Sequence, residues 1–255
     1  VRVAANGVSL SGFTVAGSGQ RFDLMDGGVH LQGDDLAVEG VTVRDTLFGI
    51  LVERCKRATV RGNRVIGTGL PAMGLRGDGI RLWETSDSVV EDNVVTDCRD
   101  MVVWYSSRNR LSRNQVRRSR YGTHFMYSHD NVVEDSYYVE DEVGVFVMYS
   151  HGIVLRRNLL AKAGGPAGIG IGLKESGDVI LSGAPIYAEA GGIFSGATPP
   201  PPLGETTGFK SVRIAVEDLV PASLGLDVDR ACYAEGGLSG LGGGRCGPVG
   251  PGLSC

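Results

Sequence analysis

The sequence predicts an all-β protein over residues 1–180: a right-handed parallel β-helix built from stacked coils of about 22 residues. Two short phrases recur at this period, each with the alternation typical of a strand. Glycine is also abundant, with 40 residues in a chain of 255, where average usage gives about 18. Residues 181–255 lack both phrases, and we expect an irregular tail rich in glycine and proline there.

The first recurring phrase has an apolar residue at its third position, which we use as the anchor of each coil. It appears as VSLSGFTV, LAVEGVTV and SVVEDNVV, among other copies. By subtraction, successive anchors lie 28, 22, 30, 21, 22, 22 and 25 residues apart: Leu10, Val38, Val60, Val90, Leu111, Val133, Leu155 and Ile180. This period is too short for paired-helix repeats and fits coils of two or three short strands.

The second phrase precedes the first in each coil and begins with glycine in all copies but MVVWYS, as in GVHLQG, GIRLWE and GVFVMYSH. A residue without Cβ suits a tight bend before the strand. Alternate residues of a strand face opposite sides. We therefore expect one apolar set to point into the core: Val29, Leu31, Ile50, Val52, Ile80, Leu82, Phe125, Val145 and Val147.

Asparagine recurs three residues after the anchor, at Asn63, Asn93, Asn114 and Asn158, and Ser136 takes that place in one coil. At a corner shared by stacked coils, each asparagine can hydrogen-bond its own turn and the asparagine of the next coil. We expect such a ladder.

The tail differs sharply in composition from the repeats. Residues 181–255 hold eight of the ten prolines and sixteen of the forty glycines, and they show neither strand nor helix periodicity. Two interpretations remain open: a genuine flexible extension, or a change of translation frame within the gene. The abrupt end of the pattern inside an otherwise regular coil favours the second. We assign the tail no function.

Charge and cysteine content exclude several classes of protein. The net charge is −4, which argues against a general nucleic-acid binder, since neutralising phosphates needs excess Lys and Arg. A local run of arginines is expected to consist of solvated turn and edge residues: Arg108, Arg110, Arg113, Arg117, Arg118 and Arg120. The five cysteines include no C-x-x-C pair and predict neither a zinc site nor a disulfide framework.

No targeting or membrane segment is visible in the chain. No run of 18 apolar residues occurs, so no transmembrane segment is expected. The chain opens inside a repeat without the pattern of a signal peptide. We therefore take it to be a fragment.

The residues of opposite parity to the core set are expected to form columns on the outer face. An exposed column is predicted from Trp83, Trp104, Met126 and Met148, with His124 and Phe146 two residues before the methionines. Two further columns follow, one of Tyr105, Tyr127 and Tyr149 and one containing His129 and His151. Because neighbouring coils are about 4.8 Å apart, Met126 should lie beside Met148 and His129 beside His151.

Thioether sulfur and imidazole nitrogen together suit Cu(I) rather than Mg²⁺ or Ca²⁺. Three of the four histidines fall within residues 124–151, so we interpret this set as candidate copper contacts: Met126, Met148, His124, His129 and His151. Large apolar side chains on an outer face mark interaction sites, so we interpret the rest as a partner surface: Trp83, Trp104, Phe146, Tyr105, Tyr127 and Tyr149. The alternative is that other segments cover these residues and that the histidines are ordinary surface groups.

A carbohydrate-active function is the second hypothesis, since many parallel β-helices cleave or epimerise polysaccharides with outer-face carboxylates. The aligned acids of this chain, such as Asp87 with Asp130 and Glu91 with Glu134, look like corner residues. No P-loop, nucleophile elbow or H-E-x-x-H motif occurs. We expect no catalytic residues. A pure scaffold that touches neither metal nor sugar is the third hypothesis.

Three segments carry a resemblance to a known family: YGTHFMYSHDNVVED from Tyr121, VGVFVMYSHGIVLRRN from Val143 and GIGIGLKESGD from Gly168. They resemble the NosD family, periplasmic β-helix proteins with repeats of the carbohydrate-binding and sugar-hydrolase (CASH) type. The resemblance covers about residues 1–180. It implies an accessory role in nitrous oxide reductase maturation, in which family members work with an ABC transporter to deliver copper to the reductase.

The resemblance further implies export to the periplasm. The implied partners are the membrane subunits of the transporter, a copper chaperone and the reductase itself. Only the HFMYSH and FVMYSH positions carry over as copper or partner contacts: His124, Met126, His129, Met148 and His151. The chain departs from the family pattern at both ends, where the N-terminal cap and the later coils are missing.

Overall fold

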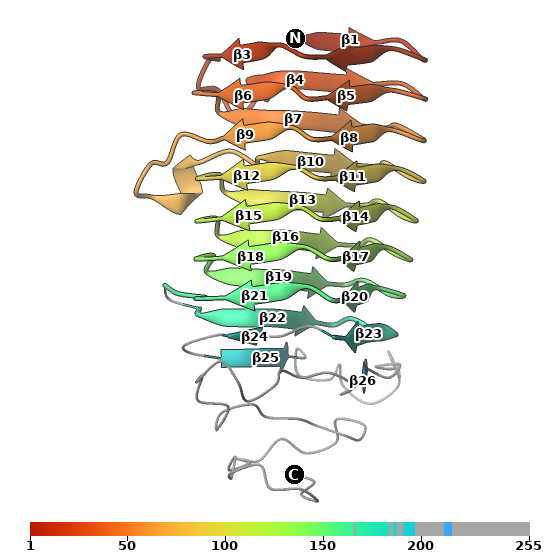
Figure 1. Ribbon diagram of the computed structural model, residues 1–255, viewed down its shortest axis with the longest axis vertical. Helices are drawn as coiled ribbons and strands as arrows, with labels where there is room; N and C mark the ends of the chain where they lie inside the picture. Colours follow the sequence, from red (N-terminus) through yellow and green to blue (C-terminus); the bar gives the residue numbers. More distant parts are fainter. Residues whose placement is uncertain (166, 184–185, 188–190, 197–211, 216–255) are drawn as a thin grey trace, which may run out of the picture.

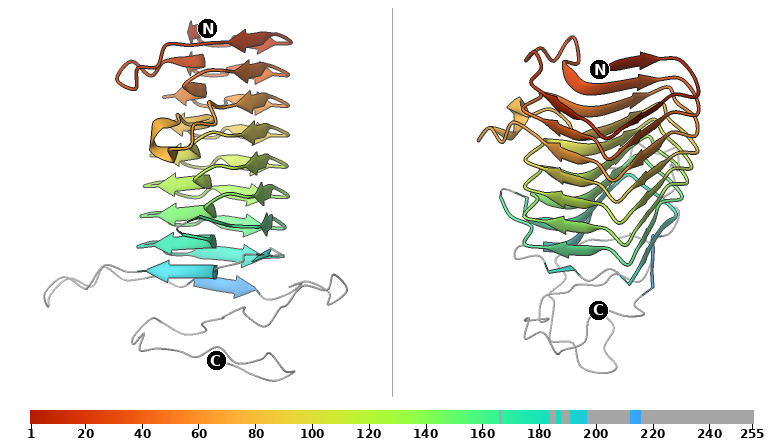
Figure 2. Two further views of the ribbon diagram at one scale, coloured as in Figure 1. Left: turned by 90° about the vertical axis from the view of Figure 1, so that its left-hand side faces the viewer. Right: turned by 45° about the horizontal axis from the view of Figure 1, so that its top comes forward.

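The computed structural model describes residues 1–165, 167–183, 186–187, 191–196 and 212–215. It is a stack of coils in which each full coil gives one short strand to each of three parallel sheets (Figure 1). The side views show the coils lying directly above one another (Figure 2). The predicted parallel β-helix is confirmed.

The strands of the three sheets follow one another in chain order. The first sheet contains β1 (Arg2–Ala4), β4 (Gly27–Gln32), β7 (Phe48–Glu53), β10 (Ile80–Trp83), β13 (Asp100–Trp104), β16 (Tyr121–Met126), β19 (Val143–Met148), β22 (Ile169–Lys174) and β25 (Gly191–Gly196). The second contains β2 (Ser9–Ser11), β5 (Ala37–Glu39), β8 (Thr59–Arg61), β11 (Val89–Glu91), β14 (Arg110–Ser112), β17 (Val132–Glu134), β20 (Val154–Arg156), β23 (Val179–Ser182) and β26 (Val212–Ala215).

The third sheet contains β3 (Thr14–Ala16), β6 (Thr42–Arg44), β9 (Arg64–Ile66), β12 (Val94–Thr96), β15 (Gln115–Arg117), β18 (Tyr137–Val139), β21 (Leu159–Ala161) and β24 (Ile186–Tyr187). A short 3-10 helix, η1 (Met73–Leu75), lies in the loop that makes one coil longer than its neighbours. The extra residues therefore project from the stack and leave the register of the strands intact.

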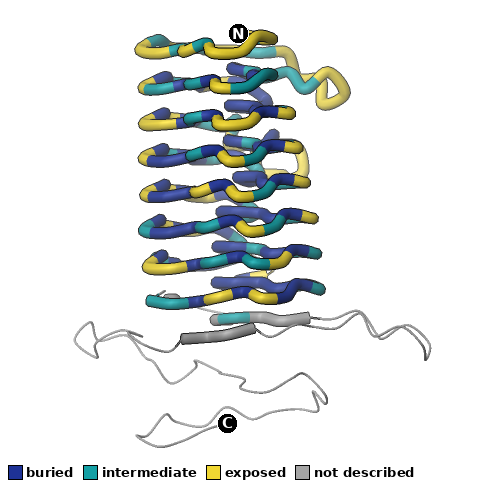
Figure 3. Tube along the Cα trace, turned by 90° about the vertical axis from the view of Figure 1, so that its right-hand side faces the viewer, coloured by how far each residue is buried: buried dark blue, intermediate teal, exposed yellow. Residues whose placement is uncertain are grey.

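The core fills the space between the three sheets. Every side chain predicted to face inward is buried, with Val29, Ile50 and Phe125 fully enclosed. In Figure 3 the strands are largely buried, whereas many of the turns between them are exposed. The two cysteines of the repeats, Cys55 and Cys98, are buried free thiols that pack in this core.

The predicted asparagine ladder is present. Asn63 donates from Nδ2 to Asn93 Oδ1 at 3.0 Å, and Asn93 donates likewise to Asn114 Oδ1 at 2.9 Å. Ser136 continues the ladder, because its Oγ accepts the Asn114 N–H and its own N–H donates to Asn158 Oδ1. A second ladder, through Ser88, Asn109 and Asn131, joins the corner between the first and second sheets and was not predicted.

A third set of contacts between coils is made of alternating charges. The corner residues Asp92, Arg113, Asp135 and Arg157 all have φ between 52° and 58° and occupy one column. Arg113 Nε lies 2.7 Å from Asp92 Oδ1, and Arg157 Nε lies 2.7 Å from Asp135 Oδ1. Five of the six arginines predicted to be solvated turn and edge residues also form ion pairs: Arg108, Arg110, Arg113, Arg118 and Arg120. Arg117 is exposed.

The structure corrects the last predicted anchor. Leu155 pairs with Leu181, so the final step is one residue longer than predicted. Ile180 faces outward with 42% of its surface exposed, whereas Leu181 is 3% exposed. Both residues are apolar, so the sequence pattern alone did not distinguish the two registers.

Strand pairing also continues past the boundary expected at residue 180. β25 pairs with β22, with Ile193 opposite Ile171, and β26 pairs with β23. Main-chain hydrogen bonds can form a parallel ladder between strands of any composition. Because the composition changes after residue 180, the sequence pattern did not predict these strands. The remainder of the predicted tail, 184–185, 188–190, 197–211 and 216–255, lies outside the described residues.

Replacing Asn93 by alanine tests the amide ladder. The change removes four hydrogen bonds and leaves buried donors without partners, which costs about 1–3 kcal/mol per unsatisfied group. We expect the free energy of unfolding in urea to fall by roughly 2–4 kcal/mol. The exposed Asn6→Ala variant is the control, and a loss no larger than in this control would contradict the structural role of the ladder.

Replacing Asp141 by asparagine tests a buried acid. Its Oδ1 accepts the Ser119 N–H at 2.8 Å and its Oδ2 is buried without a partner. Burial raises the pKa of this carboxyl well above 3.8, so the folded state keeps the proton and its stability falls as pH rises above the unfolded pKa. We expect Asp141→Asn to raise stability by roughly 1–3 kcal/mol at pH 7 and to have little effect near pH 4. Denaturant unfolding across this pH range measures it, and equal pH slopes for both proteins would contradict it.

Candidate functional site

The outer face of the first sheet carries the predicted column of large apolar side chains. The strand register aligns Trp83, Trp104, Met126 and Met148, one from each of four successive strands. The column ends at charged residues, because Glu53 pairs with Trp83 at one end and Lys174 with Met148 at the other. All four side chains are half-buried rather than exposed, since neighbours one strand apart shield each other.

His124 lies in the adjacent column of the same face and is almost fully enclosed, at 5% exposure. Three aromatic rings surround its imidazole, with centroids 5.3 Å away for Trp104, 4.9 Å for Tyr121 and 6.0 Å for Phe146. A register shift between β13 and β16 brings Asp100 opposite Tyr121 and Val102 opposite His124. Between these two paired positions β16 has one more residue than β13. This extra residue places the ring of Tyr121 against the imidazole of His124.

His124 and Met148 form a pair of soft donors. His124 Nε2 lies 3.2 Å from Met148 Sδ, and Met126 is the register partner of Met148. Two ligand atoms that bind one ion at roughly 2.0–2.3 Å can lie anywhere up to about 4.4 Å apart. The imidazole and the thioether are therefore placed to bind the same ion with little movement. Among the described residues, no three His, Cys, Asp or Glu side chains form a metal site, so a site here depends on methionine sulfur.

Beside this donor pair lies a buried layer of acids and arginines that the sequence analysis missed. Asp78 and Asp100 have no exposed side-chain surface, and each binds an arginine: Asp78 contacts Arg99 and Asp100 contacts Arg120. Burial raises the pKa of Asp78 despite Arg99. Burial also acts to raise the pKa of Asp100, but the neighbouring His124 and Arg120 lower it overall. The recurrence of aspartate just before the strand phrase in two successive coils was the signal that could have revealed this layer.

His129 and His151 lie apart from that group, at the corner that follows the first sheet. Their rings stack with centroids 5.4 Å apart, and the His151 backbone N–H donates to His129 Nδ1 at 3.2 Å. Within the described residues, no hydrogen bond or ring contact joins this pair to His124 or Met148. The five predicted copper contacts therefore form two groups. In the second group the two imidazole rings stack on each other.

The predicted tyrosine column is an exposed aromatic ladder. Tyr105, Tyr127 and Tyr149 stack with centroids 5.4 Å and 4.9 Å apart and with planes 11° from parallel. Trp83 meets the ring of Tyr105 edge-on at 5.1 Å. Tyr105 and Tyr127 are 46% and 45% exposed. Trp83 and Trp104, which belong to the predicted partner surface, are in register with the methionines. Trp104 and Phe146 both pack against His124.

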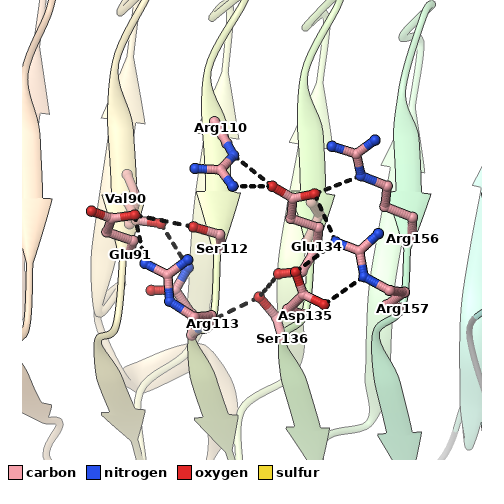
Figure 4. A network of polar contacts seen from close by, with 12 residues as sticks. Val90, Glu91, Arg110, Ser112, Arg113, Glu134, Asp135, Ser136, Arg156 and Arg157 are labelled. Carbon is pink, nitrogen blue, oxygen red and sulfur yellow. Dashed lines mark hydrogen bonds and ion pairs between the residues drawn. The ribbon is translucent and has the colours of Figure 1, made fainter.

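Three of the aligned acids weighed as candidates for carbohydrate chemistry, Asp87, Glu91 and Glu134, are bound by arginines. Figure 4 shows Glu134 between Arg110 and Arg156, and Glu91 bound by Arg113 in the neighbouring coils. Arg108 holds the pKa of Asp87 at about 2 by hydrogen bonding. These carboxylates stabilise the stack.

The described residues also include no helix long and apolar enough to cross a membrane.

Comparison with known proteins links the chain to one family. A family model described as periplasmic copper-binding protein (NosD) matches residues 67–198, which is about half of the chain and includes both FMYSH/VMYSH segments. The match therefore covers His124, Met126 and Met148. It also covers the tyrosine column of Tyr105, Tyr127 and Tyr149.

Among solved structures that resemble the chain, the first one shows the same fold. A mutant of the periplasmic alginate epimerase AlgG superposes with a TM-score of 0.52 at 18% identity, over 67% of this chain and 47% of that one. The surface adhesin PfbA of Streptococcus pneumoniae has a TM-score of 0.48 at 11% identity, over 77% of this chain and 71% of that one. A curated relative, ketimine reductase mu-crystallin of Mus musculus, is 60% identical over 55 residues, which is 22% of this chain and 17% of that protein.

The stacked histidine pair gives a testable titration. Burial and the neighbouring His151 lower the pKa of His129 below 6.5. We expect His151→Gln to raise the His129 pKa part of the way back, because it removes a like charge but leaves the burial. Proton NMR of the imidazole during a pH titration measures this. Ser107→Ala, on the opposite side of His129 in the same column, is the control, and an unchanged pKa in His151→Gln would contradict the coupling.

Proposed function

Since the chain belongs to the NosD family of periplasmic copper-binding proteins, we propose that it handles Cu(I) during the maturation of nitrous oxide reductase. In this proposal the protein works in the periplasm with an ABC transporter and delivers copper to the copper centre of the reductase. Its partners are the membrane subunits of the transporter, a copper chaperone and the reductase. The protein is an accessory factor without catalytic residues of its own.

The donor pair of His124 and Met148 is the observation that carries this proposal. The 3.2 Å separation of Nε2 and Sδ brings one imidazole and one thioether together inside the segment that matches the family. This donor set is selective for a soft ion such as Cu(I) and unsuited to Mg²⁺ or Ca²⁺. Met126, the register partner of Met148, supplies a third donor from the same face.

The surroundings of the pair suit transient binding. All its donors are neutral when they bind, and a partner that offers thiolates attracts the ion more strongly. His124 is buried and Met126 and Met148 are half-buried, so the donors are shielded while part of each methionine side chain stays accessible. The exposed tyrosine ladder beside it offers a docking surface at which a partner could approach the ion. His129 and His151 form a second contact region on the same side of the column.

Removing both thioethers tests the proposal. We expect Met126→Ala with Met148→Ala to weaken Cu(I) binding at least about tenfold, because the remaining imidazole cannot hold a soft ion alone. An anaerobic titration of Cu(I) against a competing chelator measures the affinity, and circular dichroism checks that the β-rich fold is intact.

The control for this experiment is Met73→Ala, which removes a thioether in the projecting loop at η1, away from the column. Equal affinity in the wild type, the double variant and the control would exclude the methionines as copper ligands. Absence of Cu(I) uptake by the wild type would exclude direct copper binding and leave only a docking role.

A carbohydrate-active function is the second candidate, and the cluster of Asp100, Arg120, Tyr121 and His124 favours it. These are side chains of the kinds that act as general acid, general base and cation in sugar chemistry. The same protein titrated with a panel of neutral and acidic oligosaccharides separates the two candidates. Binding of a sugar that is lost in His124→Gln, without Cu(I) uptake, would favour the second.

A further inference from the structure

We propose that the tyrosine ladder is a site of oxidative modification, at which a one-electron oxidant joins neighbouring coils of the stack through dityrosine bonds. The ladder consists of Tyr105, Tyr127 and Tyr149. The proposal goes beyond the proposed function, because it requires neither copper nor a partner protein.

The three phenol rings are held next to one another by the repeat. They occupy the same corner of three successive coils, and their residues all have φ between 49° and 51°. Equal backbone conformations direct the side chains away from the corner in the same direction, so the rings of neighbouring coils stack. Ring centroids lie 5.4 Å apart for Tyr105 and Tyr127 and 4.9 Å apart for Tyr127 and Tyr149, with planes 11° from parallel.

The main chain keeps the rings at this spacing. The N–H groups of Tyr105, Tyr127 and Tyr149 donate to carbonyls of the next coil at 3.0, 3.2 and 2.9 Å. Trp83 meets Tyr105 edge-on at 5.1 Å, and Lys174 Nζ lies 5.6 Å from the centroid of Tyr149. The ladder therefore ends at an indole and at an ammonium group, and Tyr127 is the member with a phenol on both sides.

The phenols of the ladder are placed to lose a proton and to turn. Tyr105 and Tyr127 are 46% and 45% exposed, and Tyr149 is half-buried. Water can therefore accept the phenolic proton when an electron leaves the ring. Exposed side chains change rotamer within picoseconds to nanoseconds, so adjacent rings can turn until two ortho carbons meet.

The coupling balances with two equivalents of a one-electron oxidant, such as a peroxide-derived radical. Each of two neighbouring phenols gives one electron to the oxidant and its phenolic proton to water, which leaves two phenoxyl radicals. The unpaired spin of a phenoxyl radical lies partly on the carbons ortho to oxygen. One carbon–carbon bond forms between two such carbons, and the two ortho hydrogens then move to the oxygens and restore both phenols.

Tyr137 provides a matched control on the third sheet. It is 49% exposed, so an oxidant reaches it as easily as it reaches the ladder. Its register neighbours are Gln115 and Leu159, which carry no phenol. We therefore expect Tyr137 to couple only with a tyrosine of another molecule, at a rate that depends on the protein concentration.

The test oxidises the full chain, metal-free and dilute, with photogenerated tris(bipyridyl)ruthenium(III). Dityrosine fluorescence and mass spectrometry of the cross-linked peptides identify the bond. We expect the wild type to form intramolecular bonds from Tyr127 to Tyr105 or to Tyr149. We expect Tyr127→Phe to lose these bonds, because the new ring preserves the stack but cannot couple, and circular dichroism checks the fold. Tyr137→Phe is expected to keep the wild-type yield.

Variants at the two ends of the ladder identify the partners. We expect Tyr105→Phe to form only the bond between Tyr127 and Tyr149, and Tyr149→Phe only the bond between Tyr105 and Tyr127. Absence of dityrosine from the oxidised wild type, or dityrosine confined to covalent dimers, overturns the proposal. An intramolecular yield that is unchanged in Tyr127→Phe, or that falls as far in Tyr137→Phe, overturns it too.

Discussion

The in-register stacking of parallel strands is the constraint on which the rest of this structure depends. Each side chain lies next to the side chain at the same position of the neighbouring coil, about one strand spacing away. A buried amide therefore lies beside another amide, as Asn63 lies beside Asn93, and the two side chains can hydrogen-bond each other. A polar group that would be costly in the core of another fold becomes a contact between coils here.

The same constraint places like charges against like charges unless the sequence alternates. The corner column does alternate, from Asp92 to Arg113 to Asp135 to Arg157, so neighbours in this run carry opposite charges and pair as Asp92 with Arg113 and Asp135 with Arg157. Exposed ion pairs contribute little individually. Their contribution here is to specify the register of the coils, because a shift by one coil would place arginine beside arginine and acid beside acid. Glu134, which is buried and bound by three arginines, adds a stronger contact of the same kind.

The candidate site arises where the columns stop repeating. Trp83 and Trp104 give way to Met126 and Met148, and Arg81 and Val102 give way to His124 and Phe146. At this point a buried pair of acid and arginine, Asp100 with Arg120, lies on one side of the imidazole and a thioether lies on the other. The fold provides a rigid frame for it, since the ring of His124 is fixed by strands on both sides and by three aromatic neighbours. Family membership directs the interpretation of this arrangement towards copper, and the donor set is consistent with it.

The sequence by itself determined the fold, the core residues and the asparagine ladder, because a repeat carries its own alignment: equivalent positions can be read from the chain without knowing any distance. It also aligned Met126 with Met148 and His129 with His151. It did not distinguish Ile180 from Leu181, where both neighbours are apolar, or reveal the strands that continue past residue 180, where the repeated phrases stop. Only the tertiary structure decided that His124 Nε2 meets Met148 Sδ, that Asp100 lies behind the imidazole and that His129 and His151 stand apart. Those contacts depend on side-chain rotamers and on a local register shift, and neither is encoded in the period of a repeat.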